Sequence, residues 1–126
     1  MSGLNLYKQH IDLANDRFVA AEEMMGEEKE HMAAHLFINA AINYHNALCQ
    51  KFLNGIPSHK QHSDTSYFNE LKKFLGSDLP DYKEAYAFLM RYKSQADYGG
   101  TEISATTAKQ IQRRALKIRG IVERLL

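Results

Sequence analysis

The stretch that decides the fold is residues 33–48, AAHLFINAAINYHNAL. At helical spacing, its apolar and small side chains fall on more than one side of the helix. One side holds Ala33, Leu36, Phe37, Ala40, Tyr44 and Ala47, and another holds Ile38 and Ile42. A helix that is apolar on several sides is covered by several neighbours. The pattern therefore predicts a central helix, which begins at the acidic run 27–30 and ends near Asn54, before Gly55 and Pro57.

Amphipathic helices are predicted on both sides of this central helix. Over residues 4–25, apolar side chains recur at alternating steps of three and four, which places them on one face. A loop is expected at 55–66 and a short helix at 66–75. Two more helices are expected, one at 80–98 with a proline in its first turn and one at 104–126 with a serine N-cap.

Four long helices joined by short links predict an all-α fold. We expect an antiparallel up-and-down four-helix bundle with one additional short helix, in a single domain over residues 1–126. No segment shows the alternation of apolar and polar residues that indicates a strand.

The composition excludes several classes of protein. The chain has 126 residues, of which 44% are apolar and 25% charged, and this excludes a disordered or collagen-like chain. Its single cysteine, Cys49, cannot form an internal disulfide, which excludes a secreted disulfide scaffold. The sequence has no signal-peptide pattern and no run of about 18 apolar residues. We therefore expect a cytoplasmic protein that does not enter the membrane.

Charge is distributed unevenly along the chain. From residue 104 onward, six basic side chains accompany one acidic side chain, whereas residues 1–30 are acidic. Lys109, Arg113, Lys117 and Arg124 fall together on the side opposite the apolar stripe of the last helix. This basic ridge is either a solvated face or a contact surface for phosphate in RNA or a nucleotide, or for an acidic protein. The net charge of only +1 argues against strong non-specific binding to nucleic acid.

No motif for a cofactor or a metal is present. The sequence lacks a phosphate-binding glycine loop, G-x-S-x-G and C-x-x-C. His31 and His35 are four residues apart, as are His45 and Cys49, so each pair could place two metal ligands on one helix face. The two pairs are too far apart along the helix to share an ion, and neither has an obvious third ligand. We therefore expect no metal site and no cofactor.

The segment 91–98, RYKSQADY, is the most informative for function. Relative to the apolar stripe at Leu89, the side chains of Arg91, Gln95 and Tyr98 project to the opposite side, one heptad or less apart. An arginine and a tyrosine at this spacing could line a polar groove or a subunit contact. A solvated face that ends in a tyrosine is the alternative.

These residues resemble the HEPN superfamily, in particular the branch whose fourth helix ends in Ala-Asp-Tyr. The resemblance rests on residues 35–48, on the Ser-His-Lys at 58–60 and on residues 91–99, and it spans most of the chain. It implies a helical bundle that often forms homodimers and is often associated with a nucleotidyltransferase. HEPN members that act as RNases carry an arginine followed after four to six residues by a histidine. The arginine can stabilise charge on the scissile phosphate, and the histidine can move the proton of the attacking ribose hydroxyl.

Arg91 matches this arginine, but the permitted histidine positions hold Ala96, Asp97 and Tyr98. An ionised aspartate and a tyrosine with an ordinary pKa near 10 are poorly suited to proton transfer at neutral pH. A related HEPN version carries a tyrosine two residues after the histidine, and that tyrosine can be modified with nucleotide by the partner enzyme. Arg91, Ala96 and Tyr98 reproduce this frame without the histidine, so Tyr98 is a candidate modification site.

Three functions follow from these observations. The first is a non-catalytic or weakly active HEPN-like domain, as in one half of a toxin–antitoxin pair, that dimerises through its fourth helix and binds RNA, nucleotide or a nucleotidyltransferase. Its binding residues would be Arg91, Gln95, Tyr98, Lys109, Arg113 and Lys117. The second is a metal-independent RNA endonuclease that uses Arg91 with His59 as an acid or base. The third is a structural helical interaction module without a link to nucleotides.

Overall fold

The computed structural model describes residues 6–53, 66–98 and 102–126, and in these residues it contains helices and no strands. The elements are α1 (Leu6–Gly26), α2 (Glu30–Leu53), α3 (Ser66–Leu75), the short 3-10 helix η3 (Gly76–Asp78), α4 (Leu79–Tyr98) and α5 (Ala105–Leu125). The predicted all-α fold of four long helices and one short helix is confirmed. The predicted loop at 55–66 lies almost entirely outside the described residues.

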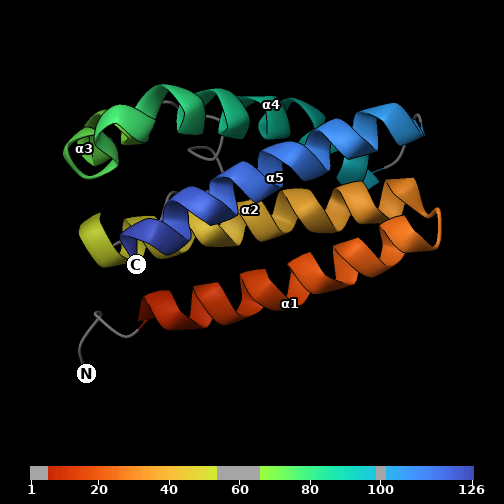
Figure 1. The fold of residues 1–126 in the computed structure, drawn as a ribbon, viewed down its shortest axis with the longest axis horizontal. Helices are drawn as coiled ribbons and strands as arrows, with labels where there is room; N and C mark the ends of the chain where they lie inside the picture. Colours follow the sequence, from red (N-terminus) through yellow and green to blue (C-terminus); the bar gives the residue numbers. More distant parts are fainter. Residues whose placement is uncertain (1–5, 54–65, 99–101) are drawn as a thin grey trace.

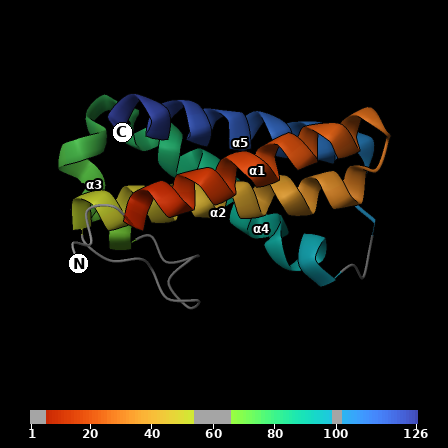
Figure 2. The same cartoon turned by 90° about the horizontal axis from the view of Figure 1, so that it is seen from below.

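Helix α2 is central, as the apolar pattern predicted. It packs against α1, α3, α4 and α5, and α1 and α4 lie on opposite sides of the α2–α5 pair (Figure 1). The four long helices alternate in direction, so the bundle is antiparallel and up-and-down in sequence order (Figure 1). Figure 2 shows α3 at the end of the bundle where α2 finishes and α4 begins.

The core is built on α2 because small and large side chains alternate around it. Every residue from Ala40 to Gln50 is buried. Phe18 of α1 meets Phe37 of α2 edge to face, with ring centroids 5.1 Å apart, a geometry that aromatic pairs favour. Buried alanines on both helices allow α1 and α2 to approach closely: Ala14, Ala21, Ala33, Ala34, Ala40 and Ala41. The opposite side of the core comes from α4 and α5.

The turn between α1 and α2 lies where the sequence predicted it, and a residue other than glycine takes the left-handed conformation there. The sequence predicted an amphipathic helix up to residue 25, and α1 ends one residue later, at Gly26. The residue in the left-handed conformation is Glu28, with φ of 60°. The backbone N–H of Lys29 donates to the carbonyl of Met24 and that of Glu28 donates to Met25, at 2.9 and 3.1 Å. These bonds form a Schellman motif, which satisfies carbonyls at the end of α1, and they place Glu28 where glycine is usually found.

The other helix ends agree with the expected capping residues. The Thr107 N–H donates to the Ser104 side-chain oxygen at 3.2 Å, so Ser104 is the N-cap of α5 as predicted. Pro80 lies in the first turn of α4, where a missing N–H costs no hydrogen bond. Among the described helices, none has the length and apolar character needed to cross a membrane.

Candidate functional site

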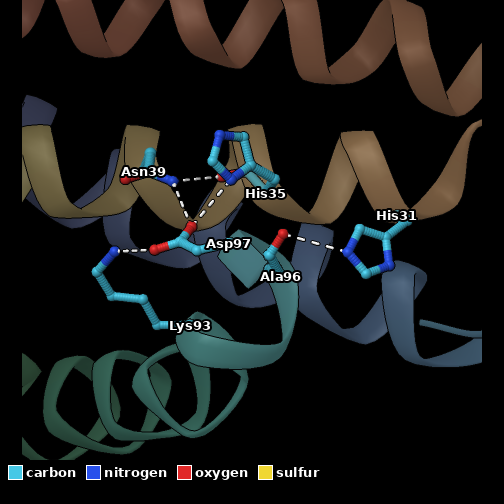
Figure 3. Close-up of polar contacts among 6 residues, drawn as sticks. All are labelled: His31, His35, Asn39, Lys93, Ala96 and Asp97. Carbon is cyan, nitrogen blue, oxygen red and sulfur yellow. Dashed lines mark hydrogen bonds and ion pairs between the residues drawn. The ribbon is translucent and has the colours of Figure 1, made fainter. Parts of the chain in front are cut away.

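A cluster of polar side chains joins α2 to the C-terminal end of α4, and we call it the polar junction. It consists of His31, His35 and Asn39 from α2 and Lys93 and Asp97 from α4 (Figure 3). His35 and Asn39 are one helical turn apart, as are Lys93 and Asp97, so each pair lies on one side of its helix. The packing of α4 on α2 brings the two pairs together.

Asp97 is the centre of the polar junction. His35 Nδ1 lies 2.9 Å from Asp97 Oδ1, and Asn39 Nδ2 donates to the same oxygen at 3.4 Å. The Lys93 ammonium pairs with the other oxygen, Oδ2. Asn39 also donates to the backbone carbonyl of His35 at 2.8 Å, which holds its amide in place. The carboxylate therefore accepts from three side chains on two helices.

These contacts determine the charge state of Asp97. Burial is the largest single influence and by itself raises the pKa of the carboxyl group. The hydrogen bond and positive charge of Lys93, together with hydrogen bonds from Asn39 and His35, outweigh burial and hold the pKa of Asp97 below its ordinary value. Asp97 is therefore ionised at neutral pH, as expected from the sequence. An ionised carboxylate can only accept, so His35 Nδ1 carries the proton of this bond.

His31 ties three elements together. Its Nε2 lies 3.2 Å from the carbonyl oxygen of Ala96, and its Nδ1 accepts from the N–H of Ile103 at 3.4 Å. Both ring nitrogens are therefore engaged, with Nε2 as the donor. His31 fixes the end of α4 and the residues before α5 against the start of α2, which is a structural role.

A second candidate feature is the basic surface, which we define as Arg91 on α4 with Lys109, Arg113, Arg114 and Lys117 on α5. The guanidinium carbons of Arg91 and Arg114 lie 5.1 and 4.1 Å from the centroid of the Phe88 ring. Two cations from different helices thus share one nearly buried aromatic ring. Arg91, Lys109, Arg113 and Lys117 are all exposed.

The charges of the basic surface are compensated unequally. Lys117 lies 3.9 Å from Asp81, and Arg114 lies 3.4 Å from Glu84, both on α4. Two carboxylates of α4 thus neutralise part of the charge of the basic surface. Within the described residues, the side chains of Arg91, Lys109 and Arg113 form no ion pair.

The structure describes the side chains of some, but not all, of the site residues predicted from the sequence. Arg91 is exposed, as expected, and Gln95 is half-buried. Tyr98 is the last residue of α4, but its side chain lies outside the described part of the structure, as does all of His59. Arg91 faces the α5 side of α4, through Phe88 and Arg114, whereas Asp97 faces α2. Arg91 and the polar junction therefore occupy different sides of the same helix.

The second pair of potential metal ligands, His45 and Cys49, is part of the core. His45 Nδ1 lies 2.7 Å from the Tyr82 hydroxyl, and its Nε2 lies 3.6 Å from the Cys49 sulfur. Burial, and to a lesser degree the charge of Glu70, raises the pKa of Cys49 to about 12, so the thiol is protonated at neutral pH. The described residues contain no group of three side chains that could hold a metal ion.

The sequence did not reveal the polar junction. Its members were visible as two i, i+4 pairs, His35 with Asn39 and Lys93 with Asp97, but the metal interpretation found no carboxylate for His35. The missing partner was Asp97, which is 62 residues away in the chain.

The sequence model of one protein family, the HEPN domain, matches residues 7–125. The chain belongs to the HEPN family. No curated protein and no solved structure matches it. HEPN domains are linked to RNA binding and to nuclease or toxin–antitoxin roles, and the helical architecture of this HEPN domain agrees with that of the family.

Proposed function

We propose that this HEPN domain binds RNA through its basic surface and has little or no RNase activity of the kind that depends on a histidine of α4. The observation that supports this most strongly is the pair of guanidinium groups, Arg91 and Arg114, on the Phe88 ring. Both guanidinium groups lie close to this ring, and Arg91 is exposed, so it can contact a ligand.

The electrostatics of this surface favour an anionic ligand. Lys109, Arg113 and Lys117 are spaced four residues apart on α5, and like charges at this spacing destabilise a helix by a few tenths of a kcal/mol, about 0.2–0.5 per pair. Only Lys117 of these three has a carboxylate near it within the described residues. Phosphate oxygens would relieve this repulsion and would accept the bidentate hydrogen bonds of a guanidinium.

The residues at the end of α4 support the proposed lack of histidine-dependent RNase activity. None of the three positions where an RNase of this family would carry its histidine holds an imidazole. Asp97 is fully engaged by Lys93, His35 and Asn39, so its carboxylate is not free to take up a proton from a substrate.

Residues at the end of α4 would contact the partners of this domain. Gln95 follows Arg91 by one helical turn and would extend the contact with RNA or with a nucleotide. Tyr98, at the end of α4, would stack on a base or accept a nucleotide from a nucleotidyltransferase. In the second case, the domain and the nucleotidyltransferase would form a toxin–antitoxin pair. Dimerisation through α4 would bring two Arg91 side chains to the same ligand. Such partners would meet the domain in the cytoplasm. The domain would extend over residues 1–126.

Fluorescence anisotropy with a labelled single-stranded RNA tests the binding. We expect Arg91→Ala and Arg113→Ala each to weaken binding about tenfold, as loss of a charge-assisted hydrogen bond implies, and to flatten the dependence of affinity on salt. Lys8→Ala is the matched control, because Lys8 is exposed on α1, across α2 from α4. RNA binding that is absent in the unmodified chain, or equal in all four proteins, would disprove the proposal. Displacement of the RNA by ATP would show that mononucleotides share the site.

A further inference from the structure

A pocket lies at one end of the bundle, where α2 finishes and α3 packs against it (Figure 2). Its volume is about 760 Å³, within the range of about 300–1,000 Å³ that is typical of small-molecule sites. It is lined by Phe52 and Leu53 of α2 and by Glu70, Lys72, Lys73 and Phe74 of α3. We propose that this pocket binds a free nucleotide, with the base on its aromatic side chains and the phosphate on its lysines. The site uses no residue of the basic surface, so it does not depend on the proposed RNA binding.

Two aromatic rings from different helices form the apolar part of the pocket. Phe52 and Phe74 are stacked, with ring centroids 4.3 Å apart and an angle of 24° between the ring planes. Both residues are half-buried, as is Leu53 beside them, so part of this apolar surface remains accessible. Nucleobases stack on aromatic side chains, because every base has a flat π-face. The stacked pair therefore suits the base of a nucleotide.

Lysines provide the positive charge beside these rings. Lys72 and Lys73 line the pocket and are exposed, and the Lys73 ammonium lies 5.1 Å from the centroid of the Phe74 ring. A third ammonium, that of Lys51, lies 5.9 Å from the centroid of Phe52. Among the residues that the structure describes, none of these three lysines pairs with a carboxylate. Lysine binds phosphate as a compact positive charge, so this side of the pocket suits the phosphate of the same ligand.

The charge of this pocket distinguishes it from two other pockets that the described residues form. In both of those, acidic side chains outnumber lysines and arginines. Their carboxylates are Glu28, Glu30 and Glu102 in one pocket and Asp12 and Glu123 in the other. In the pocket between α2 and α3, two lysines accompany one glutamate. It combines an excess of positive charge with a stacked aromatic pair, and a nucleotide carries the matching aromatic and anionic groups.

Glu70 is the acidic side chain of the pocket, and it favours one kind of base. It precedes Phe74 by one helical turn, so the two residues lie on the same side of α3. An ionised carboxylate only accepts hydrogen bonds, so Glu70 suits an amino group on the edge of a base stacked beside Phe74. Cytosine presents an amino group where uracil presents a carbonyl oxygen. We therefore expect the pocket to prefer cytidine nucleotides to uridine nucleotides.

Isothermal titration calorimetry of the full chain with CDP tests the site. We expect Lys72→Ala and Lys73→Ala each to weaken CDP binding about tenfold, as loss of a charge-assisted contact implies, and Phe74→Leu to weaken it by a similar factor through lost stacking. Lys29→Ala is the matched control, since Lys29 is an exposed lysine in the turn between α1 and α2, at the other end of the bundle (Figure 1). It should bind CDP as the unmodified chain does. Absence of CDP binding by the unmodified chain, or equal binding by all these proteins, would overturn the proposal.

Fragments of the ligand show whether both halves of the pocket contribute. Cytidine lacks the phosphate and ribose 5-phosphate lacks the base, so we expect each to bind at least tenfold more weakly than CDP. Ribose 5-phosphate that binds as tightly as CDP would overturn the role of the aromatic pair. UDP should bind several-fold more weakly than CDP, and Glu70→Gln should remove this preference; equal binding of CDP and UDP by the unmodified chain would overturn the role of Glu70. CDP should also leave RNA bound to the basic surface, and displacement of the RNA by CDP would contradict a separate site.

Discussion

Asp97 accepts a hydrogen bond from His35, 62 residues earlier in the chain, with 2.9 Å between Oδ1 and Nδ1. This bond joins the end of α4 to the first half of α2. Lys93 and Asn39 bind the same carboxylate, so one half-buried acidic group holds the segment that contains both Arg91 and Tyr98. The stability of that segment should depend on the charge of Asp97.

Stability should therefore depend on pH through Asp97. Its pKa is lower in the folded chain than its ordinary value of 3.8, so its contribution is complete well above pH 4 and is lost as the pH falls through the folded pKa. At pH 7 we expect Asp97→Asn to lower the free energy of unfolding by about 1–3 kcal/mol, because a half-buried charged hydrogen-bond network is broken. Urea unfolding of both proteins should show this difference shrinking below pH 4. A difference that is constant with pH would contradict the role of the charge.

The turn between α1 and α2 offers a stabilising substitution. Glu28 has φ of 60°, a conformation that costs an ordinary residue about 1 kcal/mol and glycine almost nothing. Glu28→Gly should therefore raise the free energy of unfolding by about 1 kcal/mol in thermal or urea denaturation. Glu27→Gly is the control, since Glu27 does not have a positive φ, and it should give no gain. Equal effects of the two substitutions would count against the strain at Glu28.

The N-cap of α5 should contribute to stability by a known mechanism. Ser104→Ala removes the acceptor for the Thr107 N–H and should cost about 1 kcal/mol of unfolding free energy. Thr106→Ala changes an exposed neighbour in the first turn and should cost less. Circular dichroism melts of the two variants would distinguish them, and a Ser104→Ala protein as stable as the parent would refute the cap.

The Phe88 ring links the core to the basic surface. Phe88→Leu keeps most of the buried volume and should cost less than about 1.5 kcal/mol of stability. It removes the aromatic face under Arg91 and Arg114, so RNA affinity should fall a few-fold, by about 0.5–1 kcal/mol. Phe74→Leu, on α3, should leave the affinity unchanged. Anisotropy titrations of both variants check this, and parallel losses in the two would show that the effect is not local.

Cys49 should be unreactive in the folded protein. Its thiol is buried and has its pKa raised to about 12, chiefly by burial, so the reactive thiolate is scarce at pH 8. We expect iodoacetamide to label Cys49 only after unfolding in urea, as followed by mass spectrometry. Rapid labelling of the native protein at the rate of a free thiol would contradict the buried position.

The bundle could be predicted because its signals are local. The spacing of apolar residues and the capping residues predicted α3 at 66–75, the end of α4 at residue 98 and the N-cap at Ser104, all of which agree with the structure. The first helix ends at Gly26, within one residue of the predicted end, but the left-handed position after it falls on Glu28. The backbone hydrogen bonds at the end of α1 determine which residue takes the left-handed conformation, and a glutamate at position 28 gives no sign of it in the sequence.

The exposed positions of Arg91, Lys109, Arg113 and Lys117 were also determined by the sequence, because each depends only on the residue's angle relative to the apolar stripe of its own helix. The partners of those helices were decided by tertiary structure. The pairing of Lys117 with Asp81, the shared ring of Phe88 and the bond from His35 to Asp97 depend on how far one helix is shifted along another. That shift results from the packing of side chains between the helices, and no period within a single helix encodes it.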